Sequence, residues 1–281
     1  MKKLYQYKLP LLGGTFREGL ILRLGEGFGE IAPLPGFSRE TLAEAREEAL
    51  RLLPYFPEAV PTLPSVRFAL DCANHPMPPS FKLSINALNQ HREGFKALKL
   101  KLGHLSLDEA LQLLKETPKH LELRLDFNRQ WPLDRLLAFA AHFTPDDFAY
   151  LEEPCSHFSD LLSFSRLTGF PIAVDESIPS IPYWEIPTLK ALIVKPTILG
   201  SVPQPPPGVE LIFSSAYESG VGLLHLARLS MQYNPSRPHG LDPYTQFLED
   251  LLPDRPLISQ GTLSWQQKGI TLHHSSLCLI S

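Results

Sequence analysis

Short apolar runs recur between residues 97 and 215, and each is followed by a polar side chain that can take part in chemistry. The six runs end at Lys101, Asp126, Glu152, Asp175, Lys195 and Ser215, in steps of 20 to 26 residues. A strand with its returning helix and two loops needs about that length of chain. The spacing therefore predicts a (β/α) barrel, in which the ends of successive strands meet at the carboxyl-terminal mouth.

The segments between these runs predict an outer layer of helices that is incomplete. Apolar periodicity indicates helices at 108–116, 133–142, 158–168 and 222–232. Five prolines between residues 195 and 210 leave no room for a full helix, because proline lacks an amide donor and clashes inside one. The stretch from 175 to 189 is nearly as unfavourable. The expected fold class is α/β, a modified TIM-type barrel lacking one or more outer helices.

The first 80 residues follow another pattern, which is α+β. A hairpin, two helices and a later strand that returns to this module are expected at 20–33, 41–53, 65–73 and 269–273. We expect a capping domain of residues 1–80 together with 256–281, and a barrel of residues 81–255 whose first strand is 81–85. The glycine-rich loop at 12–19 is either a lid over the mouth or a plain surface loop.

Bulk composition excludes several classes of function. The net charge is −4 and Lys/Arg runs are absent, which argues against nucleic acid as a partner. No apolar stretch approaches the ~18 residues of a membrane helix. Three widely spaced cysteines and an amino terminus without signal-peptide features indicate a cytoplasmic protein. A small-molecule carboxylate substrate is expected, and the oligomeric state stays open, with a monomer among the options.

Asp126, Glu152 and Asp175 form the strongest candidate site. Each follows a different predicted strand, and Mg²⁺ prefers carboxylate oxygens while keeping open positions for substrate. The alternative for each residue is a helix N-cap or a first-turn acid. Strand alternation turns the adjacent Glu153 and Glu176 away from the three.

Two lysines flank the carboxylates and are candidates for acid–base catalysis. Lys101 lies two residues after Lys99, on the same strand face, and a neighbouring cation would lower its pKa enough for it to act as a base. The alternative, a partly exposed edge-strand lysine, suits Lys99 better than Lys101. Lys195 follows a strand that is apolar on both sides, so a plain surface role explains it poorly.

Arg124, Ser214 and Ser215 complete the predicted site as substrate ligands, together with Lys99. Arg124 shares a strand face with Asp126, and its alternative role is an ion pair deep in the barrel. Ser214 and Ser215 lack the G-x-S-x-G context of a nucleophile, so hydrogen bonding to a substrate carboxylate is the better interpretation.

The motifs at these positions resemble the enolase superfamily, in its muconate-lactonising branch. The matching stretches are Lys99-Leu100-Lys101, Leu125-Asp126-Phe127-Asn128, Leu151-Glu152-Glu153-Pro154, Asp175-Glu176-Ser177 and Val194-Lys195-Pro196. The closer resemblance is to the o-succinylbenzoate synthases, and it extends over 29–38, 124–131, 214–219 and 240–242.

This resemblance implies a barrel beneath a cap built from both chain ends. It implies Mg²⁺ on Asp126, Glu152 and Asp175, with Lys101 and Lys195 as acid–base groups on opposite faces of the substrate. The implied reaction is dehydration of 2-succinyl-6-hydroxy-2,4-cyclohexadiene-1-carboxylate to 2-succinylbenzoate in menaquinone biosynthesis. Two opposed lysines suit an N-succinylamino acid racemase or a dipeptide epimerase equally well. A non-catalytic binding protein derived from such an enzyme is a third reading.

Overall fold

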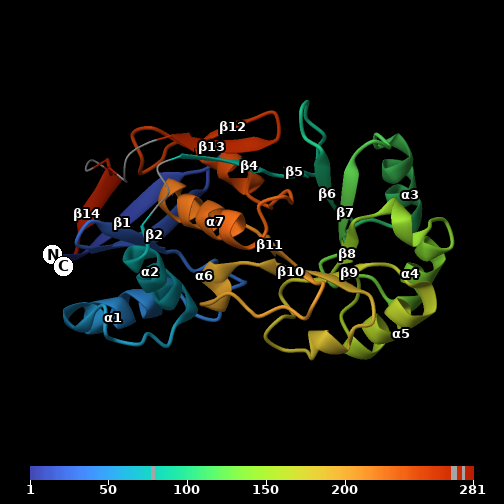
Figure 1. The fold of residues 1–281 in the computed structure, drawn as a ribbon, viewed down its shortest axis with the longest axis horizontal. Helices are drawn as coiled ribbons and strands as arrows, with labels where there is room; N and C mark the ends of the chain where they lie inside the picture. Colours follow the sequence, from blue (N-terminus) through green and yellow to red (C-terminus); the bar gives the residue numbers. More distant parts are fainter. Residues whose placement is uncertain (77–79, 267–270, 274–275) are drawn as a thin grey trace.

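Seven parallel strands form the largest sheet of the computed structural model, which describes residues 1–76, 80–266, 271–273 and 276–281 (Figure 1). The strands are adjacent in chain order. They are β5 (Ala87–Leu88), β6 (Ala97–Lys101), β7 (Glu122–Asp126), β8 (Tyr150–Glu152), β9 (Ile172–Val174), β10 (Leu189–Val194) and β11 (Glu210–Phe213). The predicted strand–helix spacing is thus confirmed from β6 onward.

The barrel is closed by single bridges rather than by a full eighth strand. Ile85 pairs with His239, and Ser214 at the end of β11 pairs with Gly240, both in the parallel sense. The segment around Gly240 thus occupies the position of the eighth strand. The first barrel strand predicted at 81–85 is largely wrong, because only Ile85 joins the barrel.

The residues just before Ile85 belong to another sheet. Strand β4 (Ser80–Ser84) pairs antiparallel with β13 (Thr262–Gln266), which also pairs with β12 (Leu257–Ser259). Phe81 and Leu83 alternate with exposed residues in β4, which is the pattern of a sheet with one buried face. This alternation suits an antiparallel sheet better than a strand inside a barrel.

Four helices cover the barrel at the predicted places. They are α3 (Leu107–Glu116), α4 (Leu133–Ala140), α5 (Phe158–Thr168) and α7 (Gly220–Tyr233). Ser106 caps α3 through a reciprocal capping box with Glu109, and Gly169 ends α5 with a left-handed φ of 72°. The β9–β10 connection holds only the 3-10 turn Tyr183–Glu185, and the β10–β11 connection only α6 (Pro196–Leu199). The predicted gap in the outer layer is therefore confirmed.

The capping sheet has the order β14-β1-β2-β3 and unites the two ends of the chain. Its strands are β1 (Lys2–Pro10), β2 (Phe16–Leu24), β3 (Gly27–Ile31) and β14 (Leu277–Leu279). The returning strand predicted at 269–273 is misplaced: residues 269 and 270 lie outside the described residues, 271–273 are irregular, and β14 does the pairing. Figure 1 shows both termini side by side at this sheet.

Two helices and a loop complete the cap. Helix α1 (Leu42–Leu52) begins at a Thr41 capping box, and α2 (Pro64–Asn74) packs against β3. Half of the glycine-rich loop predicted at 12–19 is strand, since β2 starts at Phe16, and residues 12–15 form the turn. Leu12 donates its backbone N–H to the Gln246 carbonyl at 2.8 Å, which joins the loop to the chain after the barrel.

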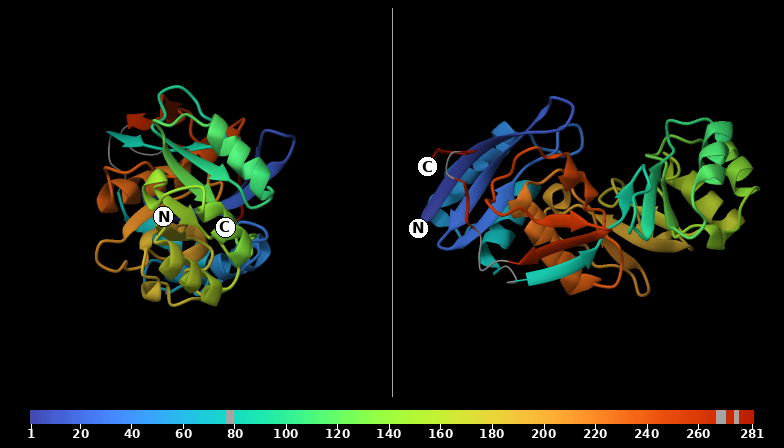
Figure 2. Two further views of the ribbon diagram at one scale, coloured as in Figure 1. Left: turned by 90° about the vertical axis from the view of Figure 1, so that its right-hand side faces the viewer. Right: turned by 90° about the horizontal axis from the view of Figure 1, so that it is seen from above.

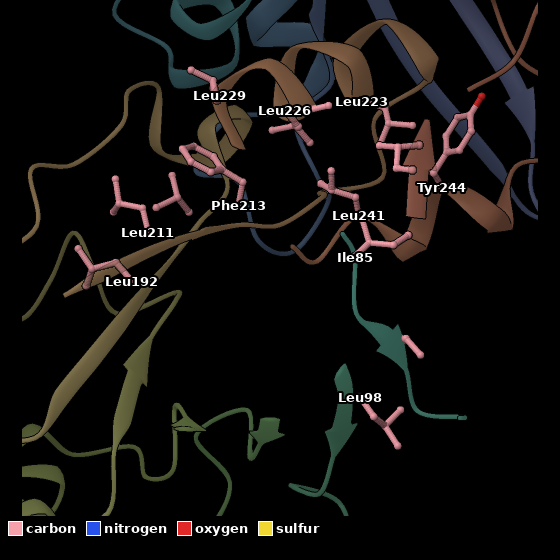
Figure 3. Packing of buried hydrophobic residues seen from close by; sticks show 14 of the residues in the cluster. Ile85, Leu98, Leu192, Leu211, Phe213, Leu223, Leu226, Leu229, Leu241 and Tyr244 are labelled. Carbon is pink, nitrogen blue, oxygen red and sulfur yellow. The ribbon is translucent and has the colours of Figure 1, made fainter. Parts of the chain in front are cut away.

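Apolar packing connects the barrel with α7. Phe213 of β11 points toward Leu226 and Leu229 of α7, while Ile85 lies close to Leu241 (Figure 3). Seen from above, the molecule is elongated, with the capping sheet at one end and α3–α5 at the other (Figure 2). Of the helices described here, none combines the length and apolarity needed to cross a bilayer.

Candidate active site

Strand register brings the first three predicted groups side by side. Lys101 is the register partner of Asp126 in β7, and Asp126 is the partner of Glu152 in β8. Asp175 follows β9 directly, and Lys195 follows β10. Parallel strands end at one edge of their sheet, so all five side chains originate at the carboxyl-terminal mouth of the barrel.

Lys99 lies between two of the carboxylates. Its Nζ is 2.9 Å from Asp126 Oδ2 and 2.6 Å from Glu152 Oε1, and its side chain is only 13% exposed. Burial disfavours the ammonium, but the Glu152 and Asp126 charges outweigh it, so the pKa of Lys99 is raised well above its usual value.

The expectation that Lys99 would be the more exposed of the two lysines is wrong, because Lys101 is the exposed one. Burial acts to raise the pKa of Asp126, but the charges of Lys99 and then of Lys101 outweigh it and lower that pKa. The difference in exposure between Lys99 and Lys101 follows from their depth in the barrel. Lys101 is the last residue of β6 and stands at the rim, whereas Lys99 is two residues further inside.

Lys195 forms an ion pair with Asp175 across the end of β9 and β10. Its Nζ is also 3.8 Å from Glu176 Oε1. Burial alone would lower the pKa of Lys195, but the negative charges of Asp175 and then of Glu176 outweigh burial, so the net shift of the pKa is upward. Lys195 is therefore held as an ammonium in this arrangement.

Glu152 carries an unsatisfied oxygen. Its Oε2 is buried and has no hydrogen-bond partner in the described part of the chain. Burial is the main cause that raises the pKa of Glu152 well above its usual value. The charge of Lys99 opposes this shift, and the charges of Asp126 and Asp175 add to it. A buried carboxylate oxygen facing other carboxylates needs a cation, so the donor set fits a hard divalent ion.

The three carboxylates do not converge on a single point in this structure. Among the described residues, no group of three metal-ligating side chains meets the spacing of a formed metal centre. The Nζ of Lys99 instead supplies positive charge between Asp126 and Glu152. Binding of a divalent ion would replace part of that interaction.

Of the two neighbouring acids, Glu153 behaves as strand alternation predicts, but the prediction is wrong for Glu176. Its Oε1 lies 3.8 Å from Lys195 Nζ and it lines a cavity together with Asp175, because β9 ends before both acids. Glu153 is turned away and accepts hydrogen bonds from the backbone N–H groups of Asp175 and Ser177, each at 2.9 Å. It also accepts from the Ser177 hydroxyl at 2.8 Å. Glu153 thus fixes the loop that carries Asp175, which is a structural task.

The structure does not bring Arg124 to the mouth. It pairs in register with Lys99 and Tyr150, one layer below the carboxylates. Its guanidinium bonds Glu122 Oε1 at 2.7 Å and the Pro238 carbonyl at 2.7 Å, at the opposite end of the strands. This geometry corresponds to the alternative role, an ion pair inside the barrel.

The two predicted serines have different surroundings. Ser214 is half-buried at the end of β11 and donates to the Gly240 carbonyl at 3.4 Å. Ser215 is buried, and its hydroxyl donates to Glu218 Oε2 at 2.7 Å. Ser214 is therefore the better placed of the two to meet a ligand, and Glu218 is a buried partner that residue spacing did not reveal.

The cap contributes residues that sequence reasoning missed. A cavity of about 200 Å³ is lined by Asp175 and Lys195 from the barrel and by Phe37 and Arg39 from the cap. The signal for these two was weak, because they lie in a loop that has no spacing relation to the barrel strands.

Comparison with known protein families agrees with this architecture. A family model described as "Enolase C-terminal domain-like" matches residues 83–186, and one described as "MenC, N-terminal domain" matches residues 1–77. The closed barrel, its cap from both chain ends and the carboxylates at the mouth define a protein of the enolase superfamily.

Curated relatives identify the family within this superfamily. The o-succinylbenzoate synthase of Pasteurella multocida is 34% identical and that of Edwardsiella ictaluri 36%, each over 85% of this chain and 88% of the relative. The synthase of Yersinia pseudotuberculosis is 32% identical over 96% of this chain and 98% of its own. The chain belongs to the o-succinylbenzoate synthase family.

Solved structures confirm the fold. An o-succinylbenzoate synthase from Thermosynechococcus elongatus, complexed with Mg in the active site, has a TM-score of 0.67 and 23% identity, covering 92% of this chain and 95% of that one. The L-Ala-D/L-Glu epimerase of Bacillus subtilis has a TM-score of 0.78 at 15% identity, covering 96% and 97%. At these identities the likeness concerns the fold alone.

Proposed function

We propose that this protein catalyses the dehydration of 2-succinyl-6-hydroxy-2,4-cyclohexadiene-1-carboxylate to 2-succinylbenzoate in menaquinone biosynthesis. One observation carries the proposal beyond family membership: the register places Lys101, Asp126 and Glu152 side by side, with the Asp175–Lys195 pair following on the next two strands. The substrate is a small dicarboxylate, and the three free cysteines support action in the cytoplasm.

Asp126, Glu152 and Asp175 would hold Mg²⁺, and the orphaned Glu152 oxygen supports this assignment. The ion would supply positive charge that stabilises the negative charge developing on the ring carboxylate. The Nζ of Lys99 contacts both Asp126 and Glu152 and so fixes the two carboxylates relative to each other. Its proposed role is to orient these two metal ligands.

Lys101 is proposed as the base and then the acid. Its neutral amine takes the proton from the carbon next to the ring carboxylate, and the resulting ammonium gives a proton to the departing hydroxyl, which leaves as water. The C–H electron pair becomes the new ring double bond, so no oxidant is needed.

Lys195 is proposed to remain charged. Its ion pair with Asp175 favours the ammonium, which then stabilises the developing negative charge from the other side of the substrate. Ser214, at the end of β11, is proposed to donate a hydrogen bond to a substrate carboxylate.

The test is turnover. Purified protein with Mg²⁺ and the cyclohexadiene substrate is expected to form the aromatic product, followed by its ultraviolet absorbance. Addition of EDTA should stop the reaction and excess Mg²⁺ restore it. If no aromatic product forms, but deuterium from solvent enters N-succinylamino acids or dipeptides, the protein is a racemase or epimerase and the proposal is wrong.

A further inference from the structure

Glu218 is a buried carboxylate that no step above uses. It lies between β11 and α7 and is 1% exposed. Its Oε1 accepts a hydrogen bond from the Thr197 hydroxyl at 2.6 Å. Its Oε2 accepts from the Ser215 hydroxyl and from the Ala216 backbone N–H, both at 2.7 Å. One side chain thus joins segments that follow two different strands.

Both segments carry proposed site residues. Thr197 is fully buried and lies two residues after Lys195, in the first turn of α6. Ser215 directly follows Ser214. The carboxylate of Glu218 therefore fixes the end of β10 relative to the end of β11.

The contact between Glu218 and Thr197 lies at the end of β10, where the outer layer of helices is thin. The ends of β6, β7, β8 and β11 lead into helices of eight residues or more, but β10 leads only into the four-residue α6. Packing of α6 against α2 and the hydrogen bond from the Ser214 N–H to the Val194 carbonyl, at 2.9 Å, hold the backbone here. The Thr197 hydroxyl adds a side-chain hydrogen bond to the loop that follows β11.

The loop around Glu218 is held in a constrained backbone conformation. Tyr217 has a φ of 61°, which is unusual for a residue with a Cβ. The cap residue Arg17 donates to the Tyr217 carbonyl at 2.8 Å and to the Ala216 carbonyl at 3.2 Å. Strained turns persist where surrounding contacts over-determine them, and such turns concentrate at functional sites.

We propose that Glu218 is a positioning residue that sets the place of Lys195 and Ser214 through its hydrogen bonds to Thr197 and Ser215. It does not touch the substrate. The proposal rests on the proposed function, in which Lys195 must face the reacting carbon. Misplacement of a catalytic group by about 1 Å can lower turnover by about 10²-fold.

The sharpest test removes one hydroxyl from Thr197. Thr197→Val keeps the shape and deletes the bond to Glu218, whereas Thr197→Ser keeps the hydroxyl. We expect kcat to fall by about 10- to 100-fold in Thr197→Val with KM changed less than about threefold, and Thr197→Ser to retain most of the activity. Thr117→Val is the matched control, because Thr117 is also buried and donates only to the Leu113 carbonyl, at 2.8 Å.

A second variant addresses the other side of the contact. Glu218→Gln puts an amide N–H₂ against the Thr197 hydroxyl or against the Ala216 N–H, so it should lower kcat as well. If Glu218 acts through Thr197, the double variant is expected to lose less than the product of the two single losses. Melting temperatures of all variants separate lost positioning from lost stability.

The outcomes are distinct. If kcat of folded Thr197→Val equals that of the wild type, or if Thr197→Ser fails as badly as Thr197→Val, the positioning role is wrong. Failure of the wild type to dehydrate the cyclohexadiene substrate would overturn the proposed function instead. The variants would then be compared by the rate of solvent-deuterium exchange into N-succinylamino acids. Thr197→Val is expected to lower that rate, relative to the wild type, by the same factor.

Discussion

Glu30 of the capping sheet accepts two hydrogen bonds from Ser219, the N-cap of the barrel helix α7. The Ser219 backbone N–H lies 2.9 Å from Glu30 Oε1, and its hydroxyl lies 2.6 Å from Oε2. Gly222 adds a third donor from the first turn of α7, at 2.9 Å. A buried carboxylate at a helix N-terminus satisfies free N–H groups and complements the helix dipole. This contact joins the cap to the barrel.

Replacing Glu30 with Ala is expected to destabilise the protein by about 3 kcal/mol or more. The change leaves the Ser219 and Gly222 donors buried without partners, at ~1–3 kcal/mol for each unsatisfied group. Urea unfolding followed by circular dichroism measures the loss. Glu26→Gln, in the exposed turn before Glu30, is the control and should not move the midpoint. Equal midpoints for the two variants would contradict the structural role of Glu30.

The sequence was sufficient for the barrel because its signal is periodic. Each strand from β6 to β11 ends in a polar group at a regular step, and register then follows from parallel pairing. Ser80–Ser84 departs from this pattern, because its alternation of buried and exposed residues is that of a half-buried antiparallel strand. Its partner β13 lies almost 180 residues further along the chain, and no local signal reveals that pairing.

Side-chain depth and long-range polar contacts were beyond sequence reasoning. Lys99 and Lys101 share one strand face, so spacing alone gives no sign of which one stands at the rim. Glu30 and Glu218 look like ordinary acids, and their partners are known only once the cap has docked. Such contacts depend on tertiary packing that leaves no local pattern.

His239, which bridges to Ile85 in the closed barrel, is expected to make stability depend on pH. Its Nδ1 accepts from the Phe213 N–H at 3.0 Å, so the proton resides on Nε2, 3.0 Å from the Asn234 carbonyl. Burial is the main cause that lowers the pKa of His239 to about 4. The hydrogen bond to the Asn234 carbonyl opposes this shift, and the charge of Arg124 adds to it. The folded-state pKa is below the unfolded value of about 6.5. The stabilisation is therefore complete above pH 6.5 and is lost as pH falls toward 4.

Urea unfolding between pH 4.5 and 7.5 measures this dependence. Each histidine that must stay neutral contributes at most about 1.4 kcal/mol per pH unit to the slope. His239→Gln removes the titrating group, so its stability should fall less steeply toward acid pH than that of the wild type. Parallel curves for the two proteins would show that His239 does not titrate as proposed.

Divalent cations are expected to stabilise the wild type and not Glu152→Gln. The orphaned Oε2 of Glu152 is the donor that a bound ion would satisfy, and an amide at this place is a far weaker ligand. Mg²⁺ at 100 times its dissociation constant would add about 2.7 kcal/mol. Melting temperatures with and without Mg²⁺ measure the effect, and Glu116→Gln on the exposed side of α3 should respond as the wild type does. A Mg²⁺-dependent increase in Glu152→Gln would remove this residue from the ligand set.

Lys101→Ala and Lys195→Ala are expected to abolish turnover while differing in stability. Loss of the general base Lys101 lowers kcat by about 10²- to 10⁴-fold. Loss of the Lys195 charge that stabilises the developing anion lowers it by about 10²- to 10³-fold, so both variants should be nearly inactive. Lys101 is exposed at the rim, and its removal should leave the melting temperature unchanged. Lys195 neutralises Asp175, which is 5% exposed, so Lys195→Ala leaves a buried charge without its partner and should melt earlier.

Binding of 2-succinylbenzoate to the two variants, measured by calorimetry, separates chemistry from recognition. Lys101→Ala should bind the product with a dissociation constant close to that of the wild type, because its proposed task is proton transfer and not binding. Retention of more than a tenth of wild-type kcat in Lys101→Ala would disprove the assignment of the base. Loss of product binding in that variant would instead make Lys101 a substrate ligand, and the proton would have to be taken by another group at the mouth of the barrel.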